Sequence, residues 1–210
     1  MNPFITGYCT IRNNGVMNDD RLSSYEENFV NFADFLRSLY KKEGLNYPKF
    51  FKMDGPGKLG FLTAELLLKQ RNMAKYAPER IGLILSNSAS SLDTDLAYFE
   101  TIRDRGNYFP SPSVFVYTLP NIVNGEICIR HKFKGENTFL VTEAFNPGLL
   151  VAHITEAMGN DRMDACIAGW VEVLRDRYES LVFLVEKEPG NAGWSEELSR
   201  EALERMFNKI

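Results

Sequence analysis

The sequence predicts an α/β protein, built on a mostly parallel mixed sheet of about five strands covered by helices. Apolar strand-like runs alternate along the chain with longer segments whose apolar residues recur at helical spacing. The run RIGLILS, residues 80–86, lacks polar alternation, which is typical of a strand covered on both faces. No repeat, low-complexity tract or linker divides the chain, so we expect one domain over residues 1–210.

The first elements are a strand, a turn and two helices. FITGYCTI, residues 4–11, is the strand, and the composition of residues 13–21, NNGVMNDDR, indicates a turn. Ser24 and Glu27 would form a capping box at the start of the first helix. The apolar face of this helix comprises Phe29, Phe32, Phe35, Leu36 and Leu39. Residues 59–74, LGFLTAELLLKQRNMA, follow a Gly-Pro-Gly break and predict a largely buried helix.

The middle of the chain continues the alternation. After the 80–86 strand, the polar link SNSASS, residues 86–91, leads into a helix, LDTDLAYFETIRDR, over residues 92–105. Residues 111–135 mix helix and strand signals, and we expect there a loop, a short helix around Asn121 to Ile129, and a turn at Lys134-Gly135.

The last third contributes three strands and two helices. The expected strands are NTFLVTEA (137–144), MDACIAGWVEV (163–173) and ESLVFLVEKE (179–188), with a helix over PGLLVAHITEAMGN (147–160). Ser195 would cap a closing amphipathic helix. The inward face of that helix comprises Leu198, Ala202, Leu203, Met206 and Phe207.

Composition excludes several classes of function. The net charge is −4 and the basic residues are scattered singly, so no electrostatic footprint for nucleic acid or an anionic membrane is present. Cys9, Cys128 and Cys166 lie in apolar runs without CxxC spacing, which favours reduced, buried thiols. With neither a signal peptide nor a run long enough to span a membrane, we expect a cytoplasmic protein.

Several stretches match, in order, the segments of a known family. They are FITGYCTIRNNG, FKMDGPGKLGFLTAELLL, IGLILSNSASS, SPSVFVYTLPNIVNGEICIRHKFKGEN and DACIAGWVE. The chain resembles the N-terminal half of a β-ketoacyl-acyl carrier protein synthase, one of the thiolase-like condensing enzymes of fatty acid and polyketide synthesis. The resemblance covers most of the chain and implies a thiolase-like fold.

The family's nucleophile is absent from the matching position. The family carries a cysteine in a turn between a strand and a helix, and the ungapped match to VTEAFNPG places Ala144 there, with Glu143, Phe145 and Asn146 as neighbours. A helix N-terminus lowers the pKa of such a thiol and favours the thiolate. Asn146 is a good cap and Pro147 a good first helical residue, so the turn is retained without its sulfur. A methyl group forms no thioester, so we expect no catalytic residue here.

A second absence agrees with the first. The family's two catalytic histidines lie in its C-terminal half, and the chain passes almost directly from GWVEV to ESLVFLVEKEP, which resembles that half's closing strand. His131 and His153 match neither catalytic position. No cluster has the spacing of metal ligands, and SNSASS lacks the glycines of a phosphate loop, so we expect neither a metal nor a cofactor.

Side chains on the helix after Ala144 predict a partner. Leu149, Leu150, Val151, Ile154 and Met158 do not form one narrow stripe, so we expect this helix to be covered on more than one side. A lone half would leave several of them in water, and an apolar patch of that kind marks an interface. The candidates are a second copy of the chain and a full-length ketosynthase, as for chain-length factors, with acyl carrier protein as a further partner.

The leading hypothesis is therefore a noncatalytic, ketosynthase-like accessory subunit in fatty acid or polyketide biosynthesis, polyenes included. Two alternatives stay open. One is a residual acyl-transfer or malonyl-decarboxylase activity that uses a partner's histidines. The other is a module that binds an acyl chain or acyl carrier protein near Ala144 and Phe145.

Overall fold

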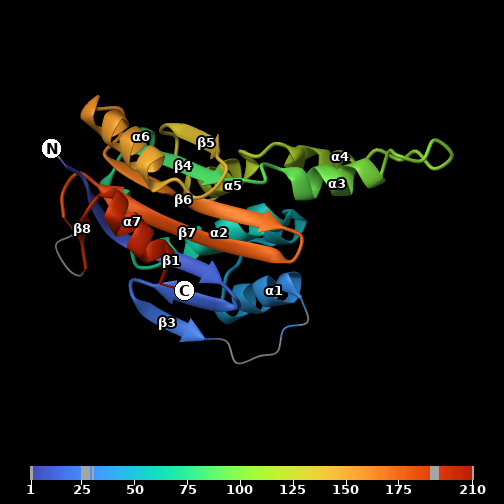
Figure 1. Cartoon of the computed structure of the whole chain (residues 1–210), viewed down its shortest axis with the longest axis horizontal. Coiled ribbons are helices and arrows are strands. Elements are labelled where there is room, and N and C mark those ends of the chain that lie inside the picture. Colours follow the sequence, from blue (N-terminus) through green and yellow to red (C-terminus); the bar gives the residue numbers. More distant parts are fainter. Residues whose placement is uncertain (1, 25–28, 30, 190–193, 210) are drawn as a thin grey trace.

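The computed structural model describes residues 2–24, 29, 31–189 and 194–209, and shows a mixed sheet between two layers of helices (Figure 1). Its five long strands are β1 (Phe4–Arg12), β4 (Ile81–Asn87), β5 (Asn137–Val141), β6 (Ala165–Leu174) and β7 (Arg177–Glu186). They lie in the order β1-β7-β6-β4-β5. Four of them run in one direction and β7 runs in the other. The predicted α/β class with a mixed, helix-covered sheet is confirmed.

The sheet is larger than the expected five strands. Three short strands add to it: β2 (Gly15–Asn18), β3 (Arg21–Ser24) and β8 (Glu196–Glu197). Residues 13–21, interpreted as one turn, form two hairpin turns with β2 between them. Both central residues of each turn have positive φ, 51° and 59° at Asn13 and Asn14, and 47° and 65° at Asp19 and Asp20. Asparagine and aspartate tolerate this conformation, which matches the twist of paired strands.

One face of the sheet is covered by three helices: α1 (Phe32–Lys42), α2 (Gly55–Leu68) and α5 (Ile122–His131). The predicted burial of α2 is confirmed, because its side chains are buried along almost its whole length. Gly60 permits the close contact with α5, since an added Cβ atom would lie 2.4 Å from a methyl carbon of Val123.

A buried ion pair joins the same two helices. Glu65 on α2 is buried, and its Oε1 lies 3.0 Å from Nε of Arg130 and 2.9 Å from Nε2 of His131. Burial alone would raise the pKa of Glu65, but the hydrogen bonds from His131 and Arg130 outweigh it and hold the pKa below its usual range. The carboxylate therefore stays charged at neutral pH and ties α2 to α5.

The start of α1 differs from the expected capping box. Ser24 ends β3, Glu27 lies outside the described residues, and the cap is Asn31, whose side chain accepts a hydrogen bond from the Asp34 amide. The apolar face is confirmed for Phe35, Leu36 and Leu39, which are buried. Residues 21–24 form a strand, and the helix begins later than predicted.

The other face is covered by α6 (Pro147–Gly159) and α7 (Arg200–Phe207). On α6, the side chains that face the sheet and α7 are Leu150, Ile154, Ala157 and Met158, and all four are buried. Leu149 remains 39% exposed. Within the described chain, α6 is thus covered by the sheet and by α7, while its side at Leu149 is open, and the expectation that a partner covers that side stays a prediction.

The closing helix also begins later than expected. Ser199, not Ser195, caps α7 by accepting a hydrogen bond from the Ala202 amide at 3.1 Å. The predicted inward face is confirmed, because Leu198, Ala202, Leu203 and Met206 are buried. Residues 196–197 pair with β1 as β8, and this pairing delays the helix.

The remaining elements include a projecting arm. It is formed by α3 (Leu92–Glu100), α4 (Pro112–Phe115) and the 3₁₀ helix η4 (Val116–Thr118), and it extends beyond the sheet (Figure 1). Its exposed apolar side chains include Leu96, Phe99, Phe109, Phe115 and Val116. Short 3₁₀ helices η1 (Pro48–Lys52), η2 (Met73–Lys75) and η3 (Pro78–Arg80) connect the other elements. Across the described ranges, no helix combines the length and apolar content that crossing a membrane requires.

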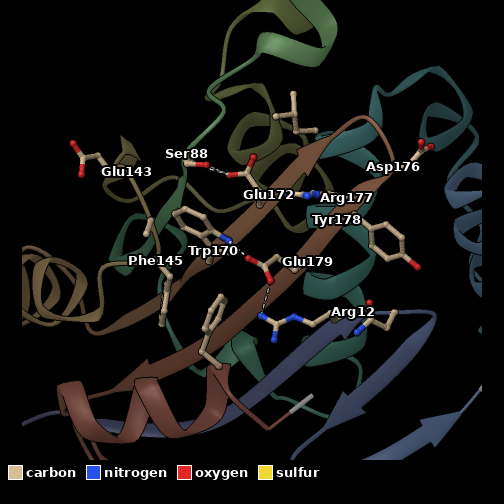
Figure 2. A pocket seen from close by; sticks show the side chains of 14 residues that line it. Arg12, Ser88, Glu143, Phe145, Trp170, Glu172, Asp176, Arg177, Tyr178 and Glu179 are labelled. Atoms are coloured by element: carbon tan, nitrogen blue, oxygen red, sulfur yellow. Dashed lines mark hydrogen bonds and ion pairs between the residues drawn. The ribbon is translucent and has the colours of Figure 1, made fainter.

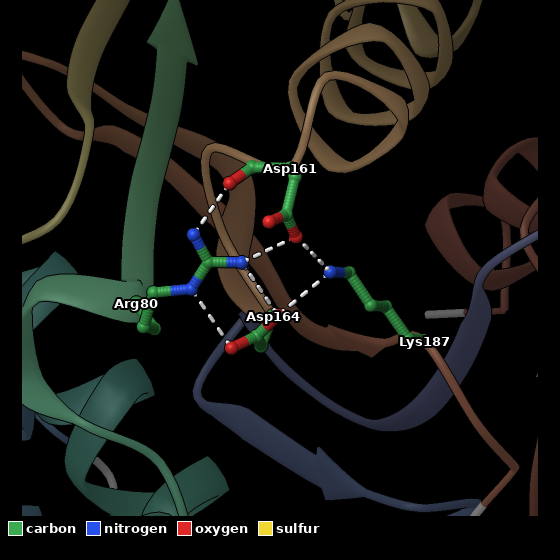
Figure 3. Close-up of polar contacts among 4 residues, drawn as sticks. All are labelled: Arg80, Asp161, Asp164 and Lys187. Carbon is green, nitrogen blue, oxygen red and sulfur yellow. Dashed lines mark hydrogen bonds and ion pairs between the residues drawn. The ribbon is translucent and has the colours of Figure 1, made fainter.

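Four charged side chains form an ion-pair cluster at the end of the sheet where β4 and β6 begin (Figure 3). Asp164 accepts hydrogen bonds from Nε of Arg80 at 2.9 Å and from Nζ of Lys187 at 2.7 Å, and both cations also reach Asp161. These hydrogen bonds, first from Arg80 and then from Lys187, hold the pKa of Asp164 well below its usual range. The cluster connects η3, the segment after α6, and the end of β7.

Candidate functional site

The turn between β5 and α6 has the geometry that the sequence predicts. β5 ends at Val141, and α6 begins at Pro147 after an Asn146 cap that accepts a hydrogen bond from the Leu149 amide at 3.0 Å. The Thr142 hydroxyl donates to the carbonyl of Ala144 at 2.8 Å and fixes the turn. Ala144 is exposed between strand and helix, so its methyl group faces open space rather than a packed core.

A cleft of about 590 Å³ opens beside this turn (Figure 2). It is lined by residues from several segments distant in sequence: Arg12, Asn13, Ser88, Glu143, Ala144, Phe145, Trp170, Glu172, Leu174, Asp176, Arg177, Tyr178, Glu179 and Phe207. A cleft of this size accommodates a small molecule or part of a chain-like ligand. Glu143 points away from Trp170 toward solvent in Figure 2. Glu143 is exposed.

Aromatic rings line one side of the cleft. Phe145 stacks on Phe207 of α7 with ring centroids 4.4 Å apart, and it meets Trp170 edge-on at 6.1 Å. The guanidinium carbon of Arg12 lies 4.5 Å from the Phe207 centroid. The last residue of α7 therefore closes the side of the cleft next to Ala144, and it does so through ring stacking and a cation–π contact.

Several polar groups of the cleft are paired with one another. Glu179 lies 2.6 Å from Arg12 and accepts a hydrogen bond from Nε1 of Trp170 at 3.1 Å. Glu172 accepts hydrogen bonds from the amide and hydroxyl of Ser88, at 2.6 and 2.9 Å, and from the Ala89 amide at 3.3 Å. Two amides of the SNSASS link, those of Ser88 and Ala89, are thus occupied by a carboxylate of the chain itself, and the Ser90 amide donates to the Asn87 side chain.

Thiols and histidines lie away from the cleft. Cys9 and Cys166 are fully buried, Cys128 is half-buried, and burial raises the pKa of all three thiols. Nε2 of His153 on α6 is 3.4 Å from Glu136, and His131 is bound to Glu65. Among the residues that line the cleft there is no cysteine and no histidine. Over the described part of the chain, no group of three metal-binding side chains is found.

Sequence reasoning located the turn but missed most of the cleft. The sequence did not predict five residues that line the cleft, which lie on or at the end of β1, β6, β7 and α7: Arg12, Trp170, Glu172, Glu179 and Phe207. Because these residues are far apart in the sequence, no local pattern indicates that they lie close together in the fold. One signal was present: a charged residue, Glu172, interrupts an otherwise apolar strand at its carboxyl end.

Comparisons with known proteins identify the fold. No protein-family model and no curated protein matches the sequence. Among solved structures, the ishigamide ketosynthase/chain length factor superposes with a TM-score of 0.65 over 89% of this chain and 62% of that chain, at 17% identity. A ketosynthase in complex with its chain length factor from Xenorhabdus doucetiae gives a TM-score of 0.61 over 90% of this chain and 81% of that chain, at 10% identity.

A third similar structure is a type II polyketide synthase acyl-carrier protein complex with its ketosynthase, with a TM-score of 0.58 at 14% identity, over 98% of this chain and 65% of that chain. The class is therefore the thiolase-like fold of β-ketoacyl synthases and chain length factors, and the predicted resemblance is confirmed at the level of the fold. The chain spans less than two thirds of the first of these structures.

Proposed function

We propose that this protein is a noncatalytic, ketosynthase-like subunit that assists acyl chain building, in the manner of a chain length factor. The observation that carries the proposal is Ala144, exposed in the turn at the start of α6, where a condensing enzyme needs a thiolate. No cysteine is among the residues that line the cleft. The turn keeps its cap and its helix, so what the protein retains is the scaffold, and what it lacks is the attacking atom.

The partner would be a ketosynthase that contacts the open edge of the sheet. β5 pairs with β4 on one side only, and its backbone groups on the other side are not paired within the described sheet. Exposed apolar side chains lie on and beside this strand: Val141 on β5, Ile129 on α5 and Leu149 on α6. An edge strand flanked by apolar side chains is a template for strand pairing across an interface.

The direction of the backbone groups suggests a specific variant. The Thr142 amide donates to Asn87 of β4, so the amide of the preceding residue, Val141, points to the open edge. V141P removes that outward donor without removing a hydrogen bond to β4, and proline is tolerated on edge strands. V141T is the matched control, since it keeps the amide. Co-purification with a ketosynthase and sedimentation analysis should show a complex for wild type and V141T that V141P loses.

A second copy of the chain is the competing partner. Sizing the purified protein alone would then give a dimer that V141P also disrupts. A stable, well-folded monomer that binds no ketosynthase at low micromolar concentration would contradict both forms of the partner proposal.

Residual enzyme activity is the second candidate function. Glu172 and Ser88 form a hydrogen-bonded acid–hydroxyl pair in the cleft, although the cleft lining has no histidine. Incubation with malonyl-loaded carrier protein, with and without a ketosynthase, followed by mass measurement would detect decarboxylation. Product formed in the absence of a ketosynthase would favour the enzyme, whereas retention of acyl-loaded carrier protein without turnover would favour a binding module.

A further inference from the structure

A second cleft, of about 600 Å³, lies between the start of α2 and the arm. It shares no lining residue with the cleft beside Ala144. Residues 52–55 form its body side, and α3, α4 and η4 form its arm side. A cleft of this volume holds a small ligand or a long side chain.

Apolar side chains supply much of its wall. Met53 and Tyr117 are largely buried and line the cleft, and Ala97 and Val114 line its arm side. A ligand that enters between them removes apolar surface from water, which favours an alkyl or aryl group.

Two carboxylates of this cleft, Asp54 and Asp93, offer hydrogen-bond acceptors. Asp54 accepts from the Gly57 amide at 2.8 Å and from the Thr94 hydroxyl at 2.7 Å, and Asp93 accepts from the Arg175 amide at 3.0 Å. A carboxylate has about four acceptor positions, so both keep some free. Two of the hydroxyl donors are already committed, because the Thr94 hydroxyl bonds to Asp54 and the Tyr117 hydroxyl to Glu126.

The charged residues that line this cleft also favour a cationic ligand. Two carboxylates, Asp54 and Asp93, line the cleft, against one cation, the exposed Lys52. Burial is the main cause that raises the pKa of Asp54, with a smaller contribution from Asp93, while the hydrogen bonds from Thr94 and Gly57 and the charge of Lys58 lower it. A second positive charge beside Asp54 would compensate this unfavourable burial of a carboxylate.

We propose that this cleft binds a protonated amine carried on an apolar stem. The stem would lie between Met53 and Val114, and the ammonium would donate to Asp54 and Asp93. The same chemistry is available from a small alkylamine and from a lysine side chain of a partner protein.

The test compares three probes of equal chain length: hexylamine, hexanol and hexanoate. Calorimetric titration of the purified protein should give the tightest binding for hexylamine and the weakest for hexanoate. D54N keeps the helix cap and D93N keeps the side-chain acceptor, so both should fold as wild type by circular dichroism. Each should weaken hexylamine binding about tenfold, as expected when a charge-assisted hydrogen bond becomes neutral, and leave hexanol binding unchanged.

A blocking variant tests the location. A97W places a large side chain in the cleft and should abolish binding of hexylamine, whereas A152W, at an exposed position on α6 that does not line the cleft, should not. Binding of Nα-acetyl-lysine amide as tight as that of hexylamine would support a partner lysine as the source, and weaker binding would support a small amine. Equal affinities for hexylamine and hexanol, no effect of D54N and D93N, or no hexylamine binding up to its solubility limit would each overturn the proposal.

Discussion

Removal of the Phe207 ring tests how α7 closes the cleft beside Ala144. In F207A the stacking on Phe145 is lost, worth about 0.5–1.5 kcal/mol, together with the contact to the Arg12 guanidinium, worth about 0.5–1 kcal/mol. Phe207 is only half-buried, so the free energy of unfolding should fall by about 2 kcal/mol, less than for a fully buried phenylalanine. For a chain of this length the midpoint of thermal unfolding should drop by about 4–8 °C.

The assay is urea denaturation of wild type and variant, followed by far-ultraviolet circular dichroism and by tryptophan fluorescence, since Trp170 lies beside Phe145. F109A is the matched control because Phe109 is 74% exposed, and its effect should stay within about 0.5 kcal/mol. A loss below about 0.5 kcal/mol in F207A would refute the inference that contacts of Phe207 hold α7 against the side of the cleft next to Ala144.

Three further outcomes are expected. Because the pKa of Asp164 is lowered in the folded state, its ion pairs stabilise the fold above the unfolded-state pKa of about 4. This stabilisation is lost as the pH falls through the folded-state pKa. The free energy of unfolding of D164N, measured by denaturation, should therefore decrease less steeply than that of wild type as the pH is lowered. E65A leaves Arg130 without its buried partner and should lower the free energy of unfolding by about 3 kcal/mol, whereas an unchanged denaturation midpoint would exclude a structural role for the pair. A144C should be alkylated by iodoacetamide at position 144 much faster than the native cysteines, as peptide mass analysis would show, and equal labelling would mean that the turn is not exposed.

The sequence predicted those parts of the fold that local patterns determine. β4 and α2 were predicted correctly because both are apolar almost throughout, and the start of α6 because Asn146 and Pro147 are strong signals for a helix N-terminus. The strands β2 and β8 were missed because each is short and depends on pairing with β1, which no local pattern reveals.

The candidate site divides in the same way. Ala144 and its neighbours were placed from one contiguous stretch and a family resemblance. The cleft itself depends on Arg12 meeting Glu179 and on Phe207 meeting Phe145, contacts between residues far apart in the chain. Which side of α6 the chain itself covers could not be predicted for a related reason, since the packing of α7 beside it is a tertiary contact.

The most direct test of the proposed loss of catalysis is an intact-mass measurement. The purified protein is incubated with acyl-loaded and malonyl-loaded carrier protein, alone and with a ketosynthase, and its mass is recorded under conditions that preserve thioesters. The absence of a thiol at Ala144 and the burial of the native thiols predict an unchanged mass for this chain while the ketosynthase becomes acylated. An acyl adduct on any residue of this chain would contradict the proposal.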